Sequence, residues 1–173
     1  GIEGETGSMC DPSPLTAWGV YNGMKAAAKF TWGDPSLNKK RIAVQGLGYV
    51  SYFLLKYLSE EGASIVACDV DAKAIDRARK KYQFDLVDPK DIDGVDCDIF
   101  SPSAMGGAIN SDSLSRLKAK VVAGAANNQL ASEKHGEEMF KRGIVYAPDY
   151  AINAGGLMNI YHEVGTYNQT QAY

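Results

Sequence analysis

Residues 41–69 read RIAVQGLGYVSYFLLKYLSEEGASIVACD, and this stretch decides the fold. Residues 42–44 are a short apolar run typical of a buried strand, and the turn Gly46-Leu47-Gly48 follows almost at once. Apolar residues at helical spacing come next, and a second apolar run at 65–67 leads to Asp69. A strand, a glycine turn, a helix, a second strand and a terminal acid together predict a βαβ unit that binds a dinucleotide.

Each part of this unit has a physical task. Gly46 allows the tight turn, and Gly48 lets the backbone approach a pyrophosphate, which the positive N-terminal end of the helix then attracts. Asp69 is placed to accept hydrogen bonds from the adenosine ribose and to repel a 2′-phosphate, so NAD is expected to be preferred over NADP. Arg77 and Arg79 belong to the next helix, and we expect them to lie too far along it to compensate.

Two positions depart from the usual glycine pattern. The third glycine position is occupied by Ser51, whose hydroxyl could either displace the helix outward or bond a phosphate directly. Tyr49 places a bulky ring beside the phosphate site, which it either covers or blocks. Both alternatives stay open at the level of the sequence.

Composition excludes several classes of protein. The chain has 173 residues, 45% of them hydrophobic and 23% charged, with a net charge of −3, as expected for one globular core of ordinary size. No basic stripe favours nucleic acid, and no apolar run approaches the roughly 20 residues of a membrane span. Residues 1–10 lack the features of a signal peptide, and the chain does not begin with Met, which favours a fragment.

The cysteines and histidines predict neither disulfides nor a metal site. Cys10, Cys68 and Cys97 are odd in number and widely spaced, which is typical of a reduced, cytoplasmic protein. Cys68 lies in an apolar strand and is expected to be buried. His135 and His162 have no partner at metal-ligand spacing, so we interpret both as surface or structural residues.

Strands and helices alternate along the chain. Ser13 is expected to cap the first helix, Gly62 to end the second and Asp71 to cap the third. Helices are expected at 14–30, after the glycine turn, from 72 to about 82, around 114–117, at 132–142 and from about 153; strands are expected at 42–44, 65–67, 84–87, 98–100, 120–123 and 144–147. This alternation predicts an α/β fold of Rossmann type, doubly wound, with a mostly parallel sheet covered by helices on both faces. Residues 1–13 are expected to be a tail or hinge remnant, and residues 14–173 the NAD-binding domain.

Nine stretches then carry a family resemblance. They are 11–17 (DPSPLTA), 19–21 (GVY), 44–48 (VQGLG), 61–63 (EGA), 97–100 (CDIF), 117–125 (LKAKVVAGA), 127–130 (NNQL), 143–150 (GIVYAPDY) and 152–156 (INAGG). On these, the chain resembles the cofactor domain of the leucine, phenylalanine and valine dehydrogenases, within the glutamate dehydrogenase superfamily. The stretches occur in the family's order and cover nearly the whole chain.

The resemblance implies reversible oxidative deamination of a branched-chain or aromatic L-amino acid to a 2-oxo acid and ammonia, with hydride transfer to NAD. It also implies a homo-oligomer, and a partner domain outside this chain that carries the substrate-binding and catalytic lysines, so no catalytic residue is expected here. Ser101, Ala125, Asn127 and Asn153 are expected along the nicotinamide and its ribose. The expected cofactor-binding residues are therefore Gly46, Leu47, Gly48, Tyr49, Val50, Asp69, Val70, Ser101, Ala125, Asn127 and Asn153, and the expected substrate-facing residues are Thr16 and Asn153.

The departures keep a second interpretation open. Family members usually have Gly or Ala at Ser51, often Asn at Tyr49, and Cys at Ser103. We therefore expect NAD binding weaker than is usual in the family. A non-catalytic paralogue that acts as a nucleotide-binding or interaction module is the alternative. A methyltransferase also uses a glycine turn and a ribose-binding acid, but it does not explain the loops around Asn127 and Asn153.

Overall fold

The computed structural model describes residues 11–148, so the first ten residues and the helix expected from about 153 lie outside the description. The helices are α1 (Ser13–Trp32), α2 (Tyr49–Glu61), α3 (Ala72–Arg79), α4 (Ser111–Arg116) and α5 (Glu133–Lys141), with a 3₁₀ turn η1 (Ile92–Gly94). The strands are β1 (Arg41–Gln45), β2 (Ser64–Cys68), β3 (Asp85–Leu86), β4 (Ile99–Pro102), β5 (Val121–Ala123) and β6 (Val145–Ala147). Every helix and strand that the sequence predicts within this range is present.

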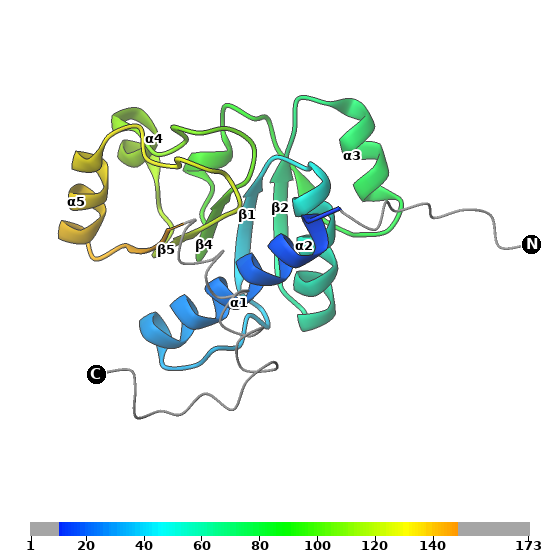
Figure 1. Ribbon diagram of the computed structural model, residues 1–173, viewed down its shortest axis with the longest axis horizontal. Coiled ribbons are helices and arrows are strands. Elements are labelled where there is room, and N and C mark those ends of the chain that lie inside the picture. The colour runs from blue at the N-terminus through cyan, green and yellow to red at the C-terminus, as the bar shows by residue number, and fades with distance from the viewer. Residues whose placement is uncertain (1–10, 149–173) are drawn as a thin grey trace, which may run out of the picture.

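The six strands form one parallel sheet in the order β3-β2-β1-β4-β5-β6. This order is that of a doubly wound Rossmann fold, and it confirms the predicted fold class. Helices cover both faces of the sheet (Figure 1). The chain leaves the sheet in opposite directions after β1 and after β4, which are neighbours, so a crevice is expected at their carboxyl ends.

Alternation along β1 shows how the two faces are filled. Ile42 and Val44 face one way and pack in a core with Leu54, Leu58 and other residues of α1, α2 and α3. Ala43 faces the other way and packs in a second core with residues of α4, α5 and η1. The period of two in the strand is therefore matched by apolar stripes on the helices of both layers.

Two helix ends follow the sequence, and one predicted cap is wrong. Gly62 ends α2 with φ +83°, and the Asp71 side chain caps α3 by accepting the Lys73 N–H at 2.9 Å, as predicted. The prediction that Ser13 caps α1 is wrong. The helix begins at Ser13 itself, and Asp11 Oδ1 accepts the Ser13 N–H at 2.9 Å. The acidic residue two positions earlier therefore takes the role expected of the serine.

Two element ends also differ from the expected ones. Strand β4 runs through Ser101 and Pro102, which pair with Val44 and Gln45 of β1, although the sequence predicts that the strand stops before them. Proline ends the strand without disrupting the sheet because it is the last paired residue. Helix α3 ends at Arg79, short of the predicted end near residue 82.

The surroundings of three side chains are also informative, and two of them were predicted. Cys68 is buried as expected, and burial raises the pKa of its thiol to about 11. His135 is structural: it is buried and its Nε2 lies 3.1 Å from Ser111 Oγ. Lys25 of α1 is half-buried and pairs with Glu61 at 3.0 Å. Glu61 lies 36 residues away at the end of α2, so helical spacing alone could not reveal this contact.

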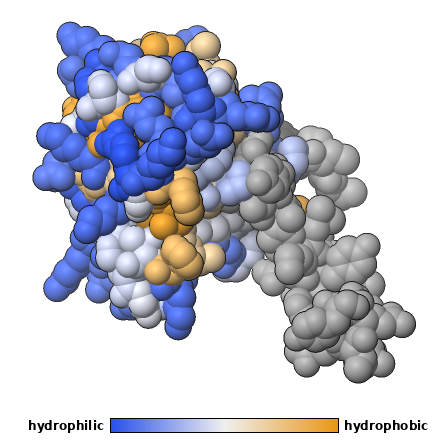
Figure 2. All heavy atoms as spheres, turned by 90° about the vertical axis from the view of Figure 1, so that its left-hand side faces the viewer, coloured by the Kyte–Doolittle hydropathy of each residue, from blue (hydrophilic) through white to orange (hydrophobic). Residues whose placement is uncertain are grey.

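One face of the molecule is largely polar. Hydrophilic side chains cover most of the face that carries α5, with apolar ones in small groups (Figure 2). Within residues 11–148, no helix is both long and apolar enough to cross a membrane.

Candidate functional site

The glycine turn lies at the carboxyl end of β1, beside the loop that follows β4. Gly46 has φ +96°, and a Cβ at this position would lie 2.7 Å from the Cβ of Ala104. It therefore has to be glycine for two separate reasons, its left-handed backbone and the close approach of the β4 loop. Gly48 is different: its φ is −62° and a Cβ there would meet nothing within 4 Å. The space in front of Gly48 is open.

Helix α2 begins directly after Gly48 and points its N-terminus into this space. Among residues 11–148, no side chain caps the helix. Its first N–H groups, including those of Tyr49 and Val50, have no carbonyl partner within the helix. An uncapped helix N-terminus behind an open glycine is suited to bind a phosphate anion. Ser51, in the first turn, is buried, and its hydroxyl has no hydrogen-bond partner among the described residues.

Asp69 follows β2 and lies against the glycine turn. Its Oδ2 accepts the Leu47 N–H at 2.5 Å, and its Oδ1 accepts the Asp71 N–H at 2.8 Å. Both oxygens keep a second lone pair, so the carboxylate is held in place and can still accept bonds from a ligand hydroxyl. The sequence places this acid correctly beside the turn.

Arg77 also reaches the turn from α3, closer than expected, while the expectation that it does not compensate for the charge of Asp69 stays a prediction. Its Nη2 donates to the Leu47 carbonyl at 3.0 Å, and its guanidinium lies 4.5 Å from the centroid of the Tyr49 ring. The Tyr49 side chain is exposed to solvent. Arg79, by contrast, lies over Phe84, with its guanidinium 5.9 Å from that ring.

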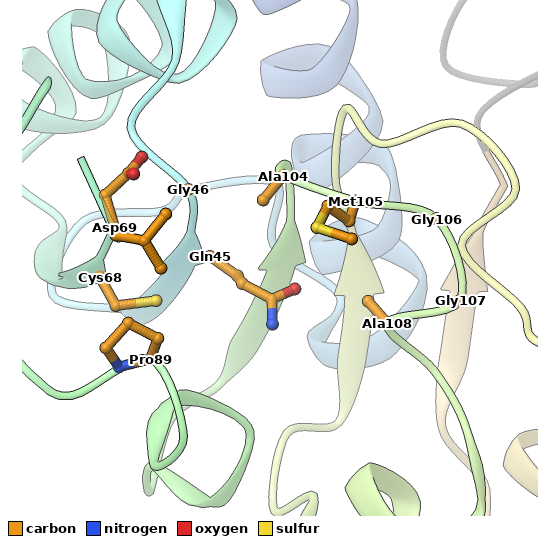
Figure 3. A pocket seen from close by; sticks show the side chains of 11 residues that line it. Gln45, Gly46, Cys68, Asp69, Pro89, Ala104, Met105, Gly106, Gly107 and Ala108 are labelled. Atoms are coloured by element: carbon orange, nitrogen blue, oxygen red, sulfur yellow. The ribbon is translucent and has the colours of Figure 1, made fainter.

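A cavity of about 240 Å³ opens next to Asp69. Figure 3 shows Asp69 and Pro89 on one side of it and Ala104 and Met105 on the other, with the Gln45 side chain between them. The complete lining is Gln45, Gly46, Cys68, Asp69, Val70, Pro89, Ala104, Met105, Gly106, Gly107 and Ala108. A mostly apolar slot beside a carboxylate is suited to a flat aromatic base.

The loops after β4 and β5 form the other half of the crevice. Gly124 lies so close to β4 that a Cβ there would be 2.2 Å from the Pro102 carbonyl oxygen. Ser101 is completely buried, and its hydroxyl lies 3.4 Å from that of Ser103, which accepts the Ala125 N–H at 3.3 Å. Ser103 therefore joins the two loops.

The remaining predicted site residues are placed as follows. Asn127 is exposed on the loop after β5. Thr16 donates its hydroxyl to the Pro12 carbonyl at 3.0 Å, inside the first turn of α1. Asn153 lies outside the described residues.

Sequence reasoning missed several residues that build the site. No motif or periodicity in the sequence singles out Ala104, Met105 or Pro89 as part of a site. Gln129 is buried, and its Nε2 donates to the Gly124 carbonyl at 2.8 Å, so it supports the loop rather than facing a ligand. The one available signal was the position of these loops after strand ends.

A comparison with known families decides the chain's membership. The profile described as Glutamate/Leucine/Phenylalanine/Valine dehydrogenase matches residues 7–75 and 70–172, which together are nearly the whole chain.

The chain belongs to the glutamate/leucine/phenylalanine/valine dehydrogenase family.

Individual members of this family are similar over almost all of the chain. It is 51% identical over 172 residues to leucine dehydrogenase of Geobacillus stearothermophilus, a match that covers 99% of this chain and 47% of that protein. It is 42% identical over 163 residues to L-tryptophan dehydrogenase of Nostoc punctiforme, covering 94% of this chain and 46% of that protein. The chain therefore spans about half the length of the curated relatives it matches.

Solved structures agree with the family and the fold. The crystal structure of L-tryptophan dehydrogenase from Nostoc punctiforme superposes with a TM-score of 0.81 at 41% identity, covering 95% of this chain and 50% of that one. The predicted resemblance and the fold class are thus both confirmed.

Proposed function

We propose that this chain is the NAD-binding part of an enzyme that converts an L-amino acid to a 2-oxo acid and ammonia. One observation carries the proposal. The open, uncapped N-terminus of α2 lies beside Asp69, at the carboxyl ends of β1 and β4, between which the strand order reverses. The 51% identity to a leucine dehydrogenase supports the reaction class. When bound, NAD supplies the acceptor of the substrate's hydride.

The residues present fit this cofactor. Gly46, Leu47 and Gly48 would cradle the pyrophosphate with the N–H groups of Tyr49 and Val50, and Asp69 would accept the ribose hydroxyls. The apolar cavity with Val70 at its edge would hold the adenine and exclude water from it. The residues assigned to the nicotinamide half are Ser101, Ala125, Asn127 and Asn153, to which the structure adds Ser103, and Thr16 and Asn153 are assigned to the substrate side.

Family membership supports the proposals for the whole protein's catalytic groups, substrate, assembly and location. The cation for the substrate carboxylate and the base that deprotonates the amine would come from a second domain, which closes a cleft over residues 14–173. The substrate would be a branched-chain or aromatic L-amino acid. A homo-oligomer in the cytoplasm, without nucleic-acid or membrane partners, completes the proposal.

Calorimetric titration tests the cofactor directly. The purified chain should bind NAD and NADH and should not bind S-adenosylmethionine. Absence of NAD binding would contradict the proposed function and favour an interaction module that keeps the fold alone. NAD binding without turnover after mixing with the separate catalytic domain of a leucine dehydrogenase would favour the non-catalytic paralogue.

A further inference from the structure

Leu47, in the middle of the glycine turn, is held from both ends by opposite charges. Its N–H donates to the Asp69 carboxylate at 2.5 Å, and its carbonyl accepts Arg77 Nη2 at 3.0 Å. Both charged residues belong to the segment made of the end of β2 and helix α3. The turn is therefore fastened to this segment and cannot rotate its peptide groups without losing a charge-assisted hydrogen bond.

The bond from Arg77 decides which way the next N–H points. The Leu47 carbonyl and the Gly48 N–H belong to one planar trans peptide, so they point in opposite directions. Because Arg77 draws the carbonyl toward α3, the Gly48 N–H is turned away from α3. A Cβ on Gly48 would meet nothing within 4 Å, so this side of the backbone leaves room for an anion.

Arg77 also holds the Tyr49 ring. The guanidinium lies 4.5 Å from the centroid of this ring, and the side chain is 63% exposed. A ring with so much exposed surface is free to change rotamer unless a contact retains it. Tyr49 is the first residue of α2, so a released ring could swing across the helix N-terminus where an anion would bind.

We propose that Arg77 is a positioning residue for the pyrophosphate of the cofactor. It orients the Leu47–Gly48 peptide toward the anion, and it keeps the Tyr49 ring out of the anion's path. This inference rests on the proposed function, because the anion is the pyrophosphate of NAD. It also resolves the ambiguity of Tyr49: the ring neither covers nor blocks the phosphate while Arg77 retains it.

The test compares ligands with and without phosphates. NAD, ADP and adenosine are titrated into the 173-residue chain and its variants, by calorimetry or, for weak ligands, by NMR. Arg77→Met should weaken the binding of NAD and of ADP about tenfold, as expected for one lost charge-assisted contact. The affinity for adenosine should stay within about twofold of that of the original chain. Arg79→Met is the matched control, since it removes the same charge from the same helix at a residue that contacts Phe84 instead. It should leave all three affinities unchanged.

The second arm isolates the ring. Tyr49→Asn removes the ring and keeps the backbone N–H assigned to the pyrophosphate, so Arg77→Met with Tyr49→Asn should bind NAD within about threefold of Tyr49→Asn alone. If Arg77→Met does not fold, Arg77→Lys takes its place, because lysine can still bond the Leu47 carbonyl but retains the ring less well. That variant should bind NAD about threefold more weakly, and adding Tyr49→Asn should restore the NAD affinity.

The outcomes that would overturn the inference are distinct from those that affect the proposed function. Unchanged NAD affinity in both Arg77 variants overturns it, as does an equal loss for adenosine and NAD, which would indicate a general structural role. A double variant as weak as the single Arg77 variant overturns the part assigned to Tyr49. If the unmodified chain binds no NAD, the proposed function fails and this inference fails with it.

Discussion

Gly46 and Gly48 serve different purposes within one turn, and alanine at each should separate them. Gly46→Ala combines left-handed strain with overpacking against Ala104, so it should destabilise the fold by about 2–5 kcal/mol. Gly48→Ala has an ordinary φ and open space, so stability should change by less than about 1 kcal/mol, while the methyl group obstructs the pyrophosphate. Urea unfolding and NAD titration of both variants check this. Equal losses of stability would contradict the distinction.

Asp69 is the residue that should set the choice between NAD and NADP. Asp69→Ala should weaken NAD binding by about 1–3 kcal/mol, because a charged acceptor of the ribose hydroxyls is lost. Asp69→Asn keeps an acceptor for the Leu47 N–H and removes only the charge. The ratio of the NAD affinity to the NADP affinity should therefore fall.

The control for both variants is Asp76→Ala, which removes an exposed acid from α3. Titrating NAD and NADP into each variant gives the measurement. Equal affinity of the unmodified chain for the two cofactors would contradict the assignment of Asp69.

For single residues, the sequence predicted contacts within one βαβ unit but not a contact made by a long side chain from the next helix. Gly46, Gly48 and Asp69 could be predicted because a strand, a turn and the next strand fix their places relative to one another. Arg77 could not, because its contact with Leu47 spans 30 residues and depends on how α3 packs beside α2. Helical spacing shows which face a residue shares, but not how far a long side chain reaches.

Among the elements, α1 and α2 are joined by a polar network centred on Glu61. Its carboxylate accepts hydrogen bonds from the Tyr21 hydroxyl, from Lys25 Nζ at 3.0 Å and from the Leu37 N–H at 2.8 Å. Burial alone would raise the pKa of Glu61, but these three partners outweigh it and the pKa is lowered below its usual value. Burial and the hydrogen bond to Glu61 raise the pKa of Tyr21, and the hydrogen bond to Glu61 raises the pKa of Lys25.

This network predicts a pH dependence of stability. A carboxyl whose pKa is lowered by folding stabilises the protein fully above its unfolded pKa of about 4.3, and that contribution is lost as the pH falls through the lower, folded pKa. Glu61→Gln should therefore reduce the free energy of unfolding by about 1–2 kcal/mol at pH 7, and the difference should shrink toward zero in stronger acid.

Urea unfolding between pH 3 and 8 measures this difference, with Glu60→Gln, its exposed neighbour, as the control. A deficit in Glu61→Gln that stays constant down to pH 3 would show that the charge is not responsible.

The elements themselves were the most predictable part of the fold. Short apolar runs flanked by turns predict the strands. Gly62 and Gly143, which both have a positive φ, mark where helices end. The loops after β4 were not predictable, since Ala104 and Met105 have no periodicity. Their role follows only from the sheet order, which brings the end of β4 beside the end of β1.

At the scale of the whole molecule, the surroundings of the lysines predict that this chain alone does not turn over amino acids. Oxidative deamination needs a base for the amine, and a lysine can serve only if burial or a neighbouring cation lowers its pKa. All lysines of the chain lie within residues 11–148, and none of them is buried there. Lys25 is among the least exposed, but its hydrogen bond to Glu61 raises its pKa and keeps it protonated. Thr16 and Asn127 can orient a ligand but cannot remove a proton at neutral pH.

The purified chain should therefore show no NADH absorbance when it is incubated with NAD and a panel of L-amino acids. Adding the separately produced catalytic domain of a leucine dehydrogenase should restore turnover, because that domain would supply the missing lysines and exclude water from the nicotinamide. Asp69→Ala should lower the restored rate when NAD is subsaturating, which ties the activity to this chain rather than to the added domain. A rate that the chain produces alone, and that persists after repurification, would contradict this division of roles and would require a base within the 173 residues.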